Sequence, residues 1–181
     1  MSSEDDCPAD RLVIKRRNEI LDEMVQVYQE AYQNYPQYAE NTKQEIVKYL
    51  KSLLKVRPEG FLVVTQNNQV VGFAIEGFYS LNGESIGEIM EVVVSPRAKG
   101  IGLGKKLLNF LLGILHQYDC EKIYLEVGRK NEIAFKLYQK LGFKSFRDDG
   151  KWIHMVKEKY PKTEESQQES PDGLISQPKE K

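Results

Sequence analysis

The chain has 181 residues, of which 40% are hydrophobic, which is enough for one well-buried core and too few for two full domains. Its 26 basic and 27 acidic residues give a formal charge of -1, so no overall positive field attracts nucleic acid or an anionic membrane. The longest apolar run, residues 107–115, falls well short of the roughly 20 residues of a membrane span, and the acidic N-terminus is unlike a signal peptide, so we expect a soluble, cytoplasmic protein.

The spacing of apolar residues divides the chain into strands and helices. In chain order these are a strand (11–17), two helices (18–32 and 42–56), three strands (61–66, 69–80 and 86–95), a helix (104–119), a strand (120–128), a helix (131–142) and two strands within 143–160. Because helices and strands are interspersed, this order predicts a mixed α/β (α+β) fold.

Composition divides the chain into three segments. We expect residues 1–10 to form a flexible N-terminus and residues 11–160 to form a single domain. Residues 161–181 are polar, so they cannot bury enough surface to offset their ordering entropy, and we expect a disordered tail. Cys7 and Cys120 lie far apart without metal-ligand spacing, which favours a reducing compartment and predicts no metal site.

Residues 95–106 read SPRAKGIGLGKK, with a glycine at every second position between a valine-rich strand and a helix. Glycine is costly to order, so this spacing predicts that a ligand approaches the main chain closely, and it disfavours an ordinary strand-to-helix connection. The free N–H groups and the dipole of the first helical turn attract phosphate. The residues concerned are the glycines Gly100, Gly102 and Gly104 and the cations Arg97, Lys99, Lys105 and Lys106.

Two common phosphate motifs do not fit this turn. A P-loop requires Ser or Thr after its lysine, where this chain has Lys106, and a dinucleotide fingerprint requires glycine where it has Lys105. The pattern RxxGxGxG from Arg97 to Gly104, after a strand that ends near Val94, instead resembles the acetyl-CoA pyrophosphate loop of the GNAT N-acetyltransferase superfamily.

A second segment, LEVGRKNEIAFKLYQKLGF (125–143), is similar to the cofactor segment that follows one strand later in this superfamily. The matching positions are Asn131, Ala134, Leu137, Tyr138, Leu141, Gly142 and Phe143. The resemblance implies a GNAT fold over residues 11–160, with a mixed twisted sheet of six to seven strands flanked by about four helices. The Leu-Glu-Val start looks most like that of the ribosomal-protein N-terminal acetyltransferases, which usually carry arginine where this chain has Gly128.

The resemblance also implies acetyl-CoA as the cosubstrate, without a metal. In this superfamily the pantetheine arm lies in a gap between two parallel strands and pairs its amides with the backbone of one of them, which here is residues 92–94. The same strand edge offers an N–H group to the thioester oxygen. The residues implied at the cofactor are Val92, Val93, Val94, Arg97, Lys99, Gly100, Ile101, Gly102, Gly104, Lys105, Asn131 and Tyr138.

The implied reaction is direct transfer of the acetyl group to a primary amine, and a lysine-like amine with a pKa of about 10.4 must lose a proton before it attacks. Glu126 lies at the position of the base in the ribosomal enzymes, and Glu88 is placed more like the base of histone-type enzymes. Glu91 lies within the cofactor strand, where alternation predicts that it faces away from Glu88, so that the two cannot share a cleft. We prefer Glu126 and Glu91 as candidates for the base.

Tyr138 is the candidate for the acid that protonates the departing CoA thiolate, because a phenol with a pKa of about 10 holds its proton at neutral pH. Packing of its ring in the core is the alternative. Asn131 is expected to cap its helix and to contact the cofactor. His154 has no partner visible in the sequence, and its place beside Trp152 makes it a candidate for the wall of the acceptor pocket.

The acceptor stays open at this stage, because a protein N-terminus, a lysine side chain and a small amine all fit. In this superfamily the first two helices and the last hairpin form the acceptor cleft. Tyrosines concentrate in the helical region here, which is more typical of core and rim packing than of recognition. A homodimer is compatible with the sequence. Two other functions stay open: a CoA-binding module without turnover, and an interaction domain in which the glycine turn is structural.

Overall fold

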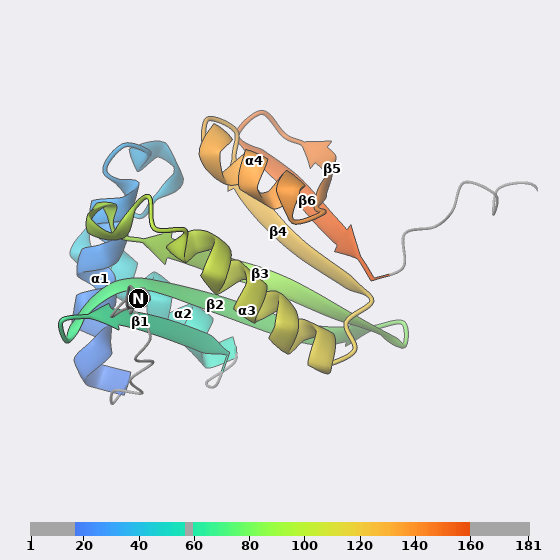
Figure 1. Cartoon of the computed structure of the whole chain (residues 1–181), viewed down its shortest axis with the longest axis horizontal. Helices are drawn as coiled ribbons and strands as arrows, with labels where there is room; N and C mark the ends of the chain where they lie inside the picture. Colours follow the sequence, from blue (N-terminus) through green and yellow to red (C-terminus); the bar gives the residue numbers. More distant parts are fainter. Residues whose placement is uncertain (1–16, 57–59, 160–181) are drawn as a thin grey trace, which may run out of the picture.

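The computed structural model describes residues 17–56 and 60–159 (Figure 1). The segments predicted at 1–10 and 161–181 lie outside this range, as does the strand predicted at 11–17 except for Arg17, which begins a helix. The described elements are α1 (Arg17–Tyr32), η1 (Pro36–Tyr38), α2 (Lys43–Val56), β1 (Phe61–Gln66), β2 (Gln69–Leu81), β3 (Glu84–Val94), η2 (Pro96–Ala98), α3 (Leu103–Gln117), β4 (Lys122–Gly128), α4 (Glu132–Lys140), β5 (Lys144–Asp148) and β6 (Trp152–Glu158).

The strands of the described residues form one mixed sheet in the order β1-β2-β3-β4-β6-β5. β3 and β4 are parallel, and the other neighbouring pairs are antiparallel. Helices α3 and α4 pack on one face of the sheet, and α1 and α2 pack on the other (Figure 1). With six strands and four α-helices in the described part of the chain, the predicted fold class is confirmed. None of these described helices is long and apolar enough to cross a membrane.

Helix α3 carries a continuous apolar face because its leucines recur at intervals of three and four residues. The buried members are Leu103, Leu107, Leu108, Leu111, Leu112 and Leu115. They pack with sheet residues such as Ile89 and Leu125 in one core. Because α3 begins directly after the glycine turn, this packing also fixes where the first turn of the helix lies at the end of β3.

β3 and β4 separate towards their carboxyl ends. They pair from Ile86 to Ile89 in β3 and from Lys122 to Leu125 in β4. Beyond Ile89 and Leu125 both strands continue without pairing to each other, and Figure 1 shows them diverging. The backbone edges that face this gap carry N–H and C=O groups available to a ligand. This is the arrangement that the resemblance implies for the cofactor site.

Truncation of Leu111 tests the packing of α3. Leu111 is fully buried, and Leu111→Ala should lower the free energy of unfolding by about 2–5 kcal/mol, because transfer energy is lost and a cavity is left. Phe110→Ala is the matched control, since the neighbouring Phe110 is 49% exposed and should lose much less. Urea unfolding followed by circular dichroism measures both variants. Equal losses would contradict the buried face assigned to α3.

Candidate active site

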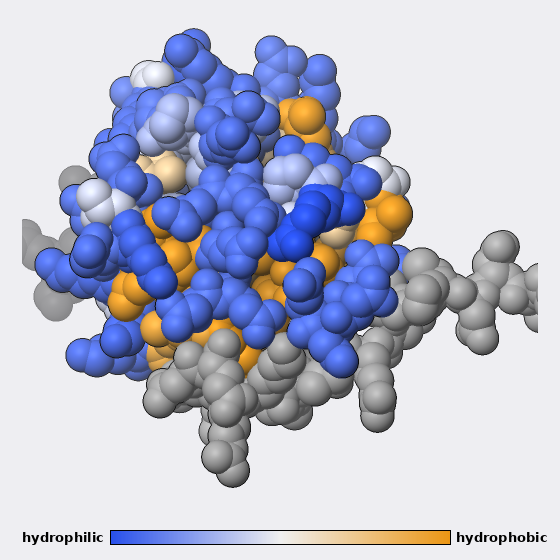
Figure 2. All heavy atoms as spheres, turned by 90° about the vertical axis from the view of Figure 1, so that its left-hand side faces the viewer, coloured by the Kyte–Doolittle hydropathy of each residue, from blue (hydrophilic) through white to orange (hydrophobic). Residues whose placement is uncertain are grey.

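The gap between β3 and β4 opens into a cavity of about 290 Å³. β3, β4 and α4 form one part of its wall, and the tyrosine-rich segment from α1 to α2 and the start of β6 complete it. The lining residues are Tyr28, Tyr32, Tyr35, Tyr38, Glu40, Tyr49, Glu88, Ile89, Met90, Glu91, Val92, Glu126, Val127, Gly128, Asn131, Ala134, Tyr138 and Trp152. The side of the molecule that carries α1 is largely hydrophilic, with apolar residues visible between the polar ones (Figure 2).

A β-bulge brings Glu88 and Glu91 to the same cavity. The register between β2 and β3 shifts between Ile75 and Glu76, which leaves Met90 as an extra residue in β3. An extra residue reverses the alternation of side chains beyond it, and both glutamates line the cavity. The prediction that they cannot share a cleft is therefore wrong, because strict alternation assumes a strand without a bulge.

The three predicted cofactor valines are core residues on a strand whose edge faces the gap. Val93 packs in the core under α1 and α2, whereas Val92 and Val94 pack against the core under α3. Val92 also lines the cavity. The side chains of residues 92–94 thus secure β3 between two cores, while its backbone stays free of β4.

Glu91 is buried and accepts hydrogen bonds from two tyrosines. Tyr32 OH and Tyr49 OH donate to its two carboxylate oxygens, at 2.9 and 3.0 Å. Burial, and next the charge of Glu91, raises the pKa of each phenol above the ordinary value of tyrosine. Tyr32 and Tyr49 therefore keep their protons and remain hydrogen-bond donors. Because both oxygens of Glu91 are engaged, this carboxylate joins α1 and α2 to β3 and suits a supporting role better than that of the base.

Glu126 is the more accessible candidate for the base. Its side chain is 56% exposed, it lines the cavity from β4, and one of its oxygens lies 2.9 Å from the imidazole of His154. Glu88 also lines the cavity, from β3, and its pKa is raised by burial and then by the charge of Glu126. Access to the cavity therefore favours Glu126 over Glu91 among the predicted bases.

Tyr138 and Asn131 reach the cavity from the α4 region. The Tyr138 ring is 9% exposed and meets the Phe143 ring edge-on, so core packing and a place in the cavity wall occur together. Burial, and then the charge of Glu91, raises the pKa of the Tyr138 phenol above its ordinary value, so it keeps its proton. Asn131 caps α4, as predicted, by accepting a hydrogen bond from the Ala134 N–H at 3.2 Å.

The glycine turn connects the end of β3 to the first turn of α3. Gly100 and Gly102 have φ values of 88° and 74°, and a Cβ at either position would meet no atom within 4 Å. Glycine is therefore needed for the path of the backbone and not to relieve crowding within the chain. Gly102 is the N-cap of α3 and provides no side-chain cap, which leaves the N–H groups of the first turn open to an anion.

The basic residues of the turn fall into two groups. The Arg97 guanidinium is held by the chain, because it contacts Glu30 at 3.2 Å and also donates to Ser95 and Gln69. Ser95 OH donates to the same Glu30 carboxylate at 2.7 Å, which fastens the end of β3 to α1. Arg97 thus supports the turn, and its contact with phosphate stays a prediction. The second group, Lys99, Lys105 and Lys106, is exposed to solvent, as is the predicted cofactor residue Ile101.

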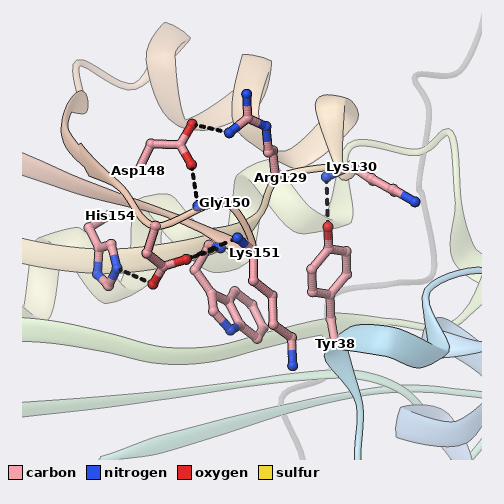
Figure 3. Close-up of polar contacts among 9 residues, drawn as sticks. Tyr38, Arg129, Lys130, Asp148, Gly150, Lys151 and His154 are labelled. Carbon is pink, nitrogen blue, oxygen red and sulfur yellow. Dashed lines mark hydrogen bonds and ion pairs between the residues drawn. The ribbon is translucent and has the colours of Figure 1, made fainter.

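Tyr38 and Gly128 form a contact that the sequence did not reveal. Tyr38 OH accepts a hydrogen bond from the Lys130 N–H at 2.9 Å (Figure 3), and its ring lies 5.0 Å from the Trp152 ring. A Cβ at Gly128 would lie 2.6 Å from atoms of the Tyr38 ring. Only glycine lets the ring occupy this position, where Tyr38 and Gly128 both line the cavity. The signal in the sequence was Gly128 itself, at a position that usually holds arginine in the ribosomal enzymes.

His154 lies behind Glu126 and not among the residues that line the cavity. Its Nδ1 is 2.9 Å from Glu126 Oε1, and its Nε2 is 3.1 Å from Asp149 Oδ2, a contact drawn in Figure 3. The neighbouring Trp152 does line the cavity. The contact with Glu126 follows from the pairing of β4 with β6, in which the two residues are opposite each other.

No group of His, Cys, Asp and Glu side chains within residues 17–56 and 60–159 is arranged to hold a metal ion. Cys120 is buried, at 1% exposure, and it does not line the cavity.

The chain matches one family of known proteins over most of its length. Residues 19–143 fit the model of the Acetyltransferase (GNAT) family, which is more than half of the chain. The chain therefore belongs to the GNAT family of acetyltransferases, and the predicted superfamily is confirmed. The family, like the curated relatives of this chain, is named for acetyl transfer.

Curated relatives come from archaea and bacteria. An uncharacterized N-acetyltransferase of Methanocaldococcus jannaschii is 29% identical over 140 residues, which cover 76% of this chain and 62% of that protein. Another uncharacterized N-acetyltransferase, from Archaeoglobus fulgidus, is 32% identical over 121 residues, which cover 65% of this chain and 82% of that protein. A mycothiol acetyltransferase of Paenarthrobacter aurescens is 42% identical over 91 residues, which cover 48% of this chain but only 28% of that protein.

Solved structures share the fold. PH1933 from Pyrococcus horikoshii OT3 is 32% identical, with a TM-score of 0.72 and coverage of 83% of this chain and 98% of that one. The PaiA N-acetyltransferase of Thermoplasma acidophilum, solved in complex with coenzyme A, is 22% identical, with a TM-score of 0.66. The match covers 80% of this chain and 96% of that one. The ribosomal-protein-S18-alanine N-acetyltransferase of Escherichia coli is 23% identical, with a TM-score of 0.61 and coverage of 83% and 95%.

Gly128→Ala tests the contact with Tyr38. The new Cβ overlaps the ring, so the substitution should lower the free energy of unfolding by about 1–3 kcal/mol. In a Tyr38→Ala background the ring is absent, and the same substitution should cost much less. Urea unfolding of the four proteins in this double-mutant cycle measures the coupling. An equal cost in both backgrounds would show that Tyr38 does not constrain Gly128.

Proposed function

We propose that this GNAT family member transfers the acetyl group of acetyl-CoA directly to a primary amine. The observation that carries the proposal is the cavity between the diverging parts of β3 and β4. Glu126 and Tyr138 line this one space together with the part of β3 that leads into the glycine turn. A proton acceptor, a proton donor and an unpaired strand edge are the groups that such a transfer needs.

The residues of the chain suit acetyl-CoA. The open N–H groups at the start of α3, together with the exposed Lys99 and Lys105, suit a diphosphate. The edge of β3 beyond Ile89 suits the amides of a pantetheine arm, which can add to it as another strand would. The coenzyme A complex of the Thermoplasma acidophilum PaiA protein supports the same class of cosubstrate here.

Acetyl-CoA supplies an activated thioester, and the chain supplies the proton transfers. Glu126 accepts a proton from the acceptor ammonium, which frees the lone pair of the nitrogen for attack. Tyr138 donates a proton to the leaving thiolate, a role that suits a buried phenol that has kept its proton. A backbone N–H group of β3 beyond Ile89 donates to the thioester oxygen.

The lining of the cavity favours a cationic acceptor. Four of its residues are glutamates, namely Glu40, Glu88, Glu91 and Glu126, and among the described lining residues there is no lysine or arginine. A carboxylate beside the acceptor amine would be repelled, whereas a second positive charge would be attracted to the carboxylates and the aromatic faces. Relatives and structural neighbours include mycothiol acetyltransferases and the NatC complex bound to a Gag peptide and CoA. Mycothiol-type, peptide and diamine acceptors therefore belong in one test panel.

An acceptor panel with detection of free thiol tests the proposal. We expect thiol release from acetyl-CoA, faster for acceptors with a second positive charge than for acceptors with a carboxylate beside the amine. CoA at a hundred times its Kd should stabilise the fold by about 2.7 kcal/mol, measured as a rise in Tm. Stabilisation without thiol release on any acceptor would indicate a CoA-binding module instead. Absence of both would contradict the cofactor site.

Tyr138→Phe tests the proton donor. The variant keeps the ring and its packing against Phe143, so CoA-induced stabilisation should be unchanged while kcat falls by about 10²-fold or more. Because burial raises the pKa of the Tyr138 phenol, the wild type should not lose activity through its ionisation below about pH 10. Full turnover of the variant with an unchanged pH profile would remove Tyr138 as the acid.

A further inference from the structure

The imidazole of His154 lies between two carboxylates. Its Nδ1 contacts Glu126 Oε1 at 2.9 Å, and its Nε2 contacts Asp149 Oδ2 at 3.1 Å. Figure 3 shows the His154 ring with its second contact as a dashed line. The His154 side chain is 16% exposed, so these contacts are largely shielded while the ring still reaches solvent. One partner, Glu126, lines the cavity.

Asp149 determines which ring nitrogen carries the hydrogen. Its Oδ1 accepts hydrogen bonds from the Trp152 and Lys151 N–H groups, at 2.7 and 3.0 Å. The hydrogen bond from the Trp152 N–H, and then the contacts with His154 and Lys151, lower the pKa of Asp149 to about 2. The Asp149 carboxylate is therefore ionised at neutral pH and can only accept hydrogen bonds. Nε2 therefore donates to Asp149, and in the neutral ring Nδ1, which lies 2.9 Å from Glu126 Oε1, carries no hydrogen.

We propose that His154 takes over from Glu126 the proton that Glu126 removes from the acceptor ammonium. In the first step an N–H bond of the ammonium breaks and an O–H bond forms on Glu126. In the second step that O–H bond breaks and an Nδ1–H bond forms, so the positive charge of the ammonium ends on the imidazolium. The partly exposed ring then returns the proton to water. The inference rests on the proposed function: His154 receives the proton by way of Glu126, and Asp149 is a positioning residue that orients the ring.

The relay makes the removal of the proton easier than a carboxylate alone would. A carboxylic acid with an ordinary pKa of about 4.3 holds a proton about a hundredfold less tightly than an imidazolium with an ordinary pKa of about 6.5. Each ring nitrogen of His154 lies within 3.1 Å of a carboxylate oxygen. Glu126 is returned to its ionised form at once, so it stays able to accept a proton.

The other groups near His154 leave its surroundings negative. Arg147 of β5 pairs with His154 in register, but its side chain is exposed to solvent. The Phe146 ring lies 6.1 Å from the imidazole and carries no charge. From β3, Glu88 interacts with the charge of Glu126. Carboxylates from β3, β4 and the turn before β6 thus lie around the imidazole or its partner Glu126.

Nitrogen NMR of the imidazole rings in the full chain tests the geometry without turnover. The chain has two histidines, so His116→Gln, in the last turn of α3, leaves only the signals of His154. We expect the Nε2–H tautomer in the neutral ring. Asp149→Asn keeps an oxygen for the Trp152 and Lys151 bonds but turns an amide N–H towards Nε2, so the neutral ring should change to the Nδ1–H tautomer. A wild-type ring with Nδ1–H would overturn the proposal.

Kinetics on the best acceptor of the panel test the relay itself. His154→Gln keeps a hydrogen-bonding group but cannot take a proton, so kcat should fall at least tenfold while the KM for acetyl-CoA and the CoA-induced rise in Tm stay unchanged. Asp149→Asn should also lower kcat, because the Nδ1–H tautomer of His154 expected in this variant leaves Nδ1 unable to take the proton. His116→Gln is the matched control and should behave as the wild type.

The pH profile separates a relay from a merely structural role. The relay works only while Nδ1 of His154 carries no hydrogen, so wild-type kcat should fall as the pH is lowered. In His154→Gln this fall should move to lower pH, because the ordinary pKa of a carboxylic acid lies below that of an imidazolium. Unchanged kcat and pH profiles in both variants, beside normal wild-type turnover, would overturn the relay alone. No turnover of any acceptor by the wild type would reject the proposed function and the relay with it.

Discussion

The separation of β3 from β4 beyond Ile89 and Leu125 is the constraint on which the site depends. Two parallel strands that part leave two unpaired backbone edges, which are costly to bury unless a ligand or water satisfies them. Here the edges stay apart because each strand is anchored on its own. β3 is held between the core under α1 and α2 and the core under α3, and β4 is held by its full pairing with β6.

The carboxylates around the gap have different environments, and these environments assign them different roles. Glu91 is enclosed and engaged by Tyr32 and Tyr49, so it ties the first two helices to the cofactor strand. Glu126 is open to the cavity and backed by His154, which is held in turn by Asp149. Glu91 of β3 therefore has a structural role, and Glu126 of β4 is the carboxylate that is accessible for proton transfer.

The sequence predicted the order of the described elements because apolar periodicity and turn residues are local signals. It also predicted the glycine turn and the cap at Asn131, which depend on residue types within a few positions of each other. The bulge at Met90 and the contact of Glu126 with His154 depend on the register between strands, which one sequence does not show. The fit of Tyr38 over Gly128 depends on packing between segments about 90 residues apart.

Chemical shifts of backbone amides during a titration with CoA test the central claim most directly, because they report where the ligand meets the main chain. The account predicts large shifts for the N–H groups of Gly100, Gly102 and Gly104 and of residues 92–94, with little change at the far end of the sheet. Binding of CoA without shifts at the glycine turn and along β3 would contradict a cofactor site built on the gap between the two strands.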